Sequence, residues 1–195
     1  MIDIPKPNKQ IIKEYLVKWD NLEDHYIWQE SSLDKLFHET YKYNTDLNEI
    51  LIKCSCLNDF YSTNIFSIFP VAKHILSLNI DDRLRKGDTT LVNDISKVKI
   101  SGVEKHFYSF ATKYCSHHNP DDFPIYDSFV EKVLIYFKSR DKFYSFKSDD
   151  LKDYSKFKEV LINFKKFYNI DEYSLKDIDR YLWQLGKDYF PKKYY

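Results

Sequence analysis

The chain of 195 residues contains little glycine, little cysteine and no excess of either charge. Its three glycines, Gly87, Gly102 and Gly186, are too few for the turns of most β-rich domains, so helices are favoured. Its three cysteines lack the spacing of a metal site, and their odd number suits a reducing, cytoplasmic location. No apolar run approaches the length that a bilayer requires, so we expect no membrane partner.

The balance of charge narrows the ways in which this chain can bind a partner. Thirty basic and 30 acidic residues give a formal net charge of zero, which argues against a nonspecific nucleic-acid binder. Aromatic residues make up 18% of the chain, so side chains that can stack on a base are plentiful. Most aromatic residues at helical spacing belong to a core. Any binding of a nucleic acid must therefore depend on residues at one local site and not on the net charge of the chain.

Apolar residues recur at intervals of three and four along most of the chain, which predicts amphipathic helices. A period of two is nowhere sustained, so we predict an all-α fold. We expect one helical domain over residues 1–195, with lobes 1–88 and 89–195 flanking a cleft. The helices are predicted at Lys9–Trp19, Ser31–Tyr43, Thr45–Leu57, Ile65–Leu78, Thr89 or Thr90 to Lys99, Phe107–Tyr114, Asp127–Phe137, Leu151–Tyr168 and Leu175–Leu185.

Capping residues mark several of the predicted helix ends. Ser31 with Asp34, and Ser174 with Asp177, have the spacing of capping boxes. Gly186 follows the last predicted helix and is expected to end it. Asp127 stands before the stripe that leads to Phe137, and aspartate is among the best N-caps.

A tight turn at Ser101–Val103 separates two predicted helices. A glycine there can leave backbone N–H groups free at the start of the second helix, where they hold a phosphate without side-chain charge. The same glycine also suits an ordinary corner between two helices. Asp127 has the same two interpretations, because a cap carboxylate can also stabilise a sugar cation or activate a nucleophile.

Taken together, the two features resemble the helix-hairpin-helix DNA glycosylase superfamily. Ile100-Ser101-Gly102-Val103-Glu104-Lys105 matches in part the hairpin of that family, although Glu104 replaces its second glycine. Pro124-Ile125-Tyr126-Asp127-Ser128-Phe129-Val130 matches its Pro-x-Asp-x-x-Val pattern with one residue inserted. Ser62-Thr63-Asn64-Ile65 lies where the 8-oxoguanine DNA glycosylases carry an asparagine-rich turn.

The resemblance implies a DNA repair enzyme that flips a damaged or modified base from duplex DNA and releases it. Asp127 would stabilise the sugar cation or activate the nucleophile. In a bifunctional enzyme with lyase activity, Lys105, or else Lys113, would form a Schiff base with the sugar.

The resemblance also implies the DNA contacts. Gly102 and Val103 would offer N–H groups to phosphate, Asn64 would fill the vacated stack, and His117 and His118 would contact the phosphate or the base. No cofactor or metal is expected, and a monomer is predicted. Glu104 and the neutral net charge favour the alternative, a helical module that binds DNA or a protein without catalysis.

Overall fold

The computed structural model describes residues 3–191, and over that range the fold is mostly helical, as expected. The chain forms two compact units, one built from residues up to Leu22 together with those from Tyr126 onward, the other from Glu23–Ile125. The units do not follow a division at residue 88, because the first helix of the chain packs against the last. No described helix is long and apolar enough to cross a membrane.

The terminal unit contains α1 (Lys9–Asp20), α8 (Ser128–Asp141), the 3-10 helix η2 (Ser148–Lys152), α9 (Tyr154–Phe167) and α10 (Leu175–Tyr189). Its core is aromatic. The ring of Phe137 on α8 lies edge-on to those of Phe164 and Tyr168, each 5.7 Å away between centroids. Tyr15 and Tyr181 join α1 to α10 in the same way, at 5.4 Å. Such pairs add about 0.5–1.5 kcal/mol to the burial of their area.

Of the predictions for the two ends of α10, the one for the start is confirmed and the one for the end is wrong. The capping box is confirmed, because Ser174 Oγ accepts from the Asp177 N–H at 3.1 Å and the Asp177 carboxylate accepts from the Ser174 N–H at 2.9 Å. The prediction that Gly186 ends the helix is wrong, since α10 continues to Tyr189. A Cβ at Gly186 would lie 2.5 Å from Cβ of Phe129, so glycine serves there to let α10 approach α8.

The middle unit contains α2 (Asp24–Lys35), the π-helical turn η1 (Leu36–Thr40), α3 (Leu47–Phe60), α4 (Ile68–Ser77), α5 (Asp81–Arg85), α6 (Thr90–Ser96), β1 (Lys97–Ile100), β2 (Val103–His106) and α7 (Tyr108–His118). Helix α3 contacts α2, α4 and α7, and its buried residues include Ile50, Cys54 and Leu57. Asp46 rather than Thr45 caps α3, with its carboxylate accepting from two N–H groups. The predicted capping box at Ser31 is wrong, because α2 begins seven residues earlier, at Asp24.

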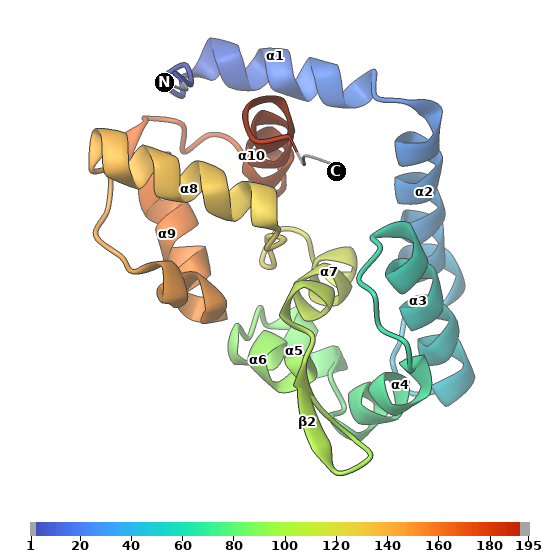
Figure 1. The fold of residues 1–195 in the computed structure, drawn as a ribbon. Helices are drawn as coiled ribbons and strands as arrows, with labels where there is room; N and C mark the ends of the chain where they lie inside the picture. The colour runs from blue at the N-terminus through green and yellow to red at the C-terminus, as the bar shows by residue number, and fades with distance from the viewer. Residues whose placement is uncertain (1–2, 192–195) are drawn as a thin grey trace. The chain divides into compact units, whose positions relative to one another are not determined.

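The segment Lys97–His106 is an antiparallel hairpin and not the end of one helix and the start of another. Ser101 and Gly102 have φ values of 49° and 83°, the two positive angles of a type I′ turn, whose twist suits paired strands. Ser-Gly is a turn dipeptide, and Lys97–Ile100 before it alternates basic and apolar residues. Val103–His106 does not alternate, so no period of two is sustained here, and the all-α prediction missed the hairpin for that reason. Figure 1 shows this hairpin extending beyond α6 and α7.

Candidate functional site

The hairpin places three of the predicted site residues away from any helix start. Gly102 and Val103 are exposed at the strand turn, so no helix dipole reinforces their backbone N–H groups. Lys105 is exposed on β2 and pairs with Val98 across the ladder. Oε1 of Glu104 lies 3.0 Å from Nε2 of His106 on the same strand. An exposed strand surface gives Lys105 none of the enclosure that a nucleophilic amine needs.

Helix α7 encloses the other candidate amine. Lys113 is 3% exposed, and its Nζ donates to Ser109 Oγ at 2.6 Å, one turn earlier on the same helix. The ring of Tyr61 lies beside this amine, 5.2 Å from Nζ to the ring centroid. Ser109 and Tyr61 are both half-buried, so they form the outer edge of the cluster. An enclosed amine of this kind is the type that enzymes use for Schiff-base chemistry.

His117 extends the same cluster by a further turn of α7. Its side chain is 2% exposed, and Nε2 lies 2.9 Å from the hydroxyl of Tyr61. Its Nδ1 lies 4.0 Å from a carboxylate oxygen of Asp34, which is on the surface of α2. Tyr61 therefore connects two candidates, Lys113 and His117, which lie four residues apart on one side of α7.

His118 faces a different set of polar groups. Its Nε2 lies 3.2 Å from Asn44 Nδ2 and 3.5 Å from Lys53 Nζ. Both of those atoms are donors, so Nε2 accepts and the ring carries its hydrogen on Nδ1. Burial, together with the neighbouring charge of Lys53, holds the pKa of His118 well below 6.5. His118 is consequently neutral at physiological pH.

Lys53, one of the polar groups beside His118, is itself fully buried. It is 0% exposed, and its Nζ donates to the carbonyl oxygens of Tyr41 and Tyr43 at 3.1 and 2.8 Å and to Asn44 Oδ1 at 2.8 Å. Burial lowers the pKa of this lysine to about 8, with Asp81 opposing the shift. All three N–H bonds of the ammonium have acceptors, as a buried cation requires.

Asn64 lies in a loop of the middle unit that also holds Tyr61. Its φ of 58° is left-handed, and its amide donates to the carbonyl of Ser62 at 2.9 Å. The side chain thus stabilises its own turn. Two residues later Phe66 is fully exposed, which sequence reasoning missed because an isolated phenylalanine carries no signal of exposure.

Asp127 caps α8, as the sequence predicts, and accepts from the N–H of Phe129 at 2.8 Å. The residue is half-buried and belongs to the terminal unit, whereas Lys113, His117 and His118 belong to the middle unit. The geometry therefore joins the α7 candidates to one another through Tyr61 and Phe37. The ring of Phe37 lies 5.4 Å from that of His117 and 4.8 Å from that of His118.

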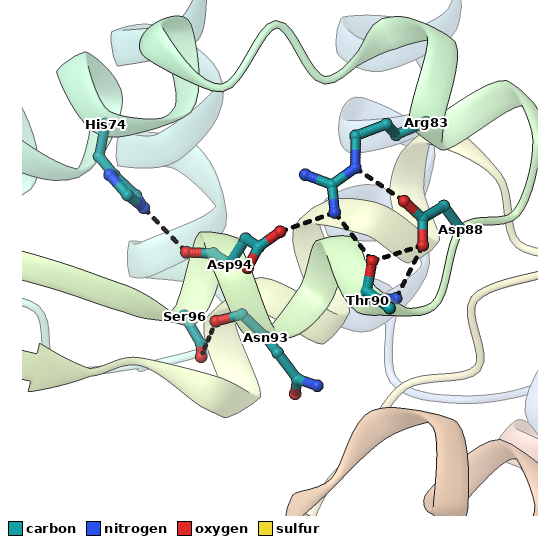
Figure 2. Close-up of polar contacts among 7 residues, drawn as sticks. All are labelled: His74, Arg83, Asp88, Thr90, Asn93, Asp94 and Ser96. Atoms are coloured by element: carbon teal, nitrogen blue, oxygen red, sulfur yellow. Dashed lines mark hydrogen bonds and ion pairs between the residues drawn. The ribbon is translucent and has the colours of Figure 1, made fainter.

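Arg83 has a structural role in the middle unit. Its guanidinium donates to Asp88 at 2.8 Å, to Thr90 Oγ1 at 3.0 Å and to Asp94 at 2.7 Å, and Figure 2 shows it between the two carboxylates. The Thr90 hydroxyl and Arg83 hold the pKa of Asp88 below its usual value. These bonds tie α5 to α6 and fix the turn between them.

Sequence reasoning also missed Tyr61, Ser109 and Lys53 as members of the site. The spacing of Ser109, Lys113 and His117 was a usable signal, because residues four apart share one face of a helix. Nothing in the sequence marks Lys53, since two of its partners are backbone carbonyls. Among residues 3–191 no group of three or more His, Cys, Asp or Glu side chains is arranged to hold a metal ion.

Comparison with known proteins identifies a family but no activity. No solved structure matches this chain. An uncharacterized protein of Haemophilus influenzae is 56% identical over 150 residues, which are 76% of this chain and 72% of that protein. The HI_0787_N family model, described as an N-terminal domain, matches residues 11–122. That range includes the hairpin, the loop of Tyr61 and the whole of α7, and the chain belongs to the HI_0787_N family.

Proposed function

We propose that the protein is a DNA base-excision glycosylase with lyase activity and that Lys113 is its nucleophile. The observation that carries the proposal is the enclosed amine of Lys113, 2.6 Å from Ser109 Oγ and beside the ring of Tyr61. Lys105 is exposed on a strand, so we assign the nucleophile to Lys113 instead. Lys113 would perform the same Schiff-base reaction that the sequence resemblance assigns first to Lys105.

The proposed reaction uses one lysine amine and one carboxylate. Nζ of Lys113 gives up a proton and bonds to C1′ of the sugar as the C1′–N bond to the base breaks. The base leaves with the electron pair of that bond and takes up a proton. Nζ then gives up a further proton, and its lone pair forms a C1′=N bond as the C1′–O4′ bond breaks and O4′ takes up a proton. The ring-opened sugar stays on Lys113 as a protonated Schiff base. The Pro124–Val130 pattern separately favours Asp127 as a carboxylate that stabilises a sugar cation, and the Asp127→Asn variant tests that assignment on its own.

The test is incubation of the whole chain with duplexes that each carry one oxidised, alkylated or phage-type modified base. Alkaline cleavage reports base release, and borohydride traps a Schiff base as a stable amine. We expect Lys113→Gln to reduce trapping by at least about 100-fold. Lys105→Gln is the matched control on the exposed strand and should trap normally. No base release by the unmodified chain across the panel would refute the proposal.

The Asp127→Asn variant distinguishes a catalytic role of this carboxylate from its role as a helix cap. Asparagine caps a helix about as well as aspartate, so stability should change little. Loss of the carboxylate should lower base release by about 100-fold or more. Ser109→Ala is a milder variant in α7, expected to weaken trapping without abolishing it.

A second candidate is a module that binds DNA or protein without catalysis. The cap at Asp127 favours it, because one hydrogen bond to Phe129 accounts for that carboxylate without any chemistry. The exposed Glu104 favours it as well, since its charge repels a phosphate at the hairpin. DNA binding that persists with no base release, and that is unchanged in Asp127→Asn, would support this candidate.

A further inference from the structure

The middle unit contains a pocket of about 590 Å³ at the C-terminal end of α7. It lies between the segment after η1, helix α5 and the end of α7. Besides Leu84, its lining residues are Lys42, Tyr43, Asp81, Arg85, His118 and Asn119. Small-molecule sites in proteins typically have volumes of about 300–1,000 Å³. His118 lines this pocket, whereas Lys113, His117 and Ser109 are not among its lining residues.

Hydrogen bonds from buried side chains fix one wall of the pocket. Lys53 donates to the carbonyl oxygen of Tyr43 at 2.8 Å. Asn44 is 2% exposed, and it donates to the Asp81 carboxylate from its backbone at 3.0 Å and from its side chain at 2.6 Å. These bonds fix the segment that carries Lys42 and Tyr43, so a ligand would meet a preformed surface.

The pocket presents both signs of charge. Lys42 and Arg85 are exposed cations, and Arg85 pairs with the exposed carboxylate of Asp82. Asp81 lies among the lining groups, and each of its oxygens accepts one bond from Asn44. An ionised carboxylate has about four acceptor sites, so Asp81 keeps capacity for donors on a ligand. The ligand should therefore carry an anionic group and N–H donors.

Tyr43 adds an aromatic surface. Its side chain is 66% exposed, although its backbone is held by Lys53. An exposed ring on a rigid backbone can stack on a planar ligand with little loss of conformational entropy. A free phosphate would use the cations and be repelled by Asp81. An aliphatic amino acid would use both charges and leave the ring uncovered.

We propose that this pocket binds a nucleotide, with the base on Tyr43, the N–H groups of the base on Asp81, and the phosphate on Lys42 and Arg85. A nucleotide is the class of ligand that combines a planar ring, N–H donors and an anion. It can come from two sources, a free mononucleotide or one unit of a nucleic-acid strand. The inference does not depend on the base-excision proposal, since Tyr43, Asp81, Lys42 and Arg85 have no part in that chemistry.

The experiment is calorimetric titration of the whole chain with the four 5′-mononucleotides, the matching nucleosides, inorganic phosphate and a single-stranded oligonucleotide. We expect at least one mononucleotide to bind, and its nucleoside and inorganic phosphate to bind at least roughly tenfold more weakly. Tyr43→Ala and Arg85→Gln should each weaken binding by roughly tenfold. Lys105→Gln, on the strand surface of the same unit, is the control and should bind normally.

The two sources give different results in competition. An oligonucleotide that is displaced by the mononucleotide identifies a strand as a ligand, and binding of mononucleotides alone identifies the free form. Either result supports the pocket. Absence of mononucleotide binding, equal affinity for inorganic phosphate, or unchanged binding in both Tyr43→Ala and Arg85→Gln would overturn it. Trapping by Lys113 is scored separately, so failure of one proposal leaves the other to its own test.

Discussion

Helices α7 and α8 are separated in the chain by residues 119–127, and they differ in the side chains that they bury. The buried residues of α8 are Val130, Val133, Leu134 and Phe137. Helix α7 buries Thr112, Lys113, Ser116 and His117 as well as apolar residues. Buried polar groups need partners and cost stability when they lack them, so a helix with several of them is a candidate for function. The contrast indicates that α8 is a core helix and α7 is the site helix.

The largest expected effect is on the core helix. Phe137 is 0% exposed and lies against the rings of Tyr136, Phe164 and Tyr168, so Phe137→Ala should lower the free energy of unfolding by about 3–5 kcal/mol. Denaturant unfolding followed by circular dichroism measures it. Phe66→Ala is the matched control, because the same side chain is fully exposed there and should change stability by less than about 0.5 kcal/mol. Equal losses in the two variants would break the contrast.

The next effect tests how closely α8 is packed. A Cβ at Gly186 of α10 would lie 2.5 Å from Cβ and 2.9 Å from the carbonyl oxygen of Phe129. Gly186→Ala should therefore cost about 1–3 kcal/mol of unfolding free energy, even though alanine is the better helix former. Thermal unfolding measures it. A gain in stability would mean that the two helices have room to separate.

The third effect is specific to α7 and depends on pH. Burial, with Lys53 nearby, keeps the pKa of His118 well below 6.5, so the unfolded chain binds a proton that the native chain does not. The free energy of unfolding should fall as the pH drops below about 6.5, by about 1–2 kcal/mol at pH 5.5. His118→Gln retains an acceptor for Asn44 and should flatten this dependence. An identical pH dependence in both proteins would remove His118 as its source.

The smallest effect concerns the hairpin before α7. Gly102 has a φ of 83°, and a Cβ added to it would meet no heavy atom within 4 Å. Gly102→Ala should therefore cost only the backbone strain, about 1 kcal/mol of unfolding free energy. Gly102→Asn should cost less, because asparagine tolerates this conformation. Denaturant unfolding of the pair measures the difference. Equal stability of all three proteins would argue against the type I′ turn.

The sequence by itself determined the helical class of the fold, the cap at Asp127 and the capping box at Ser174, because helical periodicity and caps are local properties. It also contained the turn dipeptide Ser101-Gly102, although Val103–His106 carries no strand pattern. The tertiary structure decided what the local pattern leaves open. It turned Gly186 from a helix end into a point of close approach between α10 and α8. It enclosed Lys113 and exposed Lys105, since burial depends on neighbours distant in the chain. The bonds from Lys53 to backbone carbonyls likewise exist only once the chain has folded.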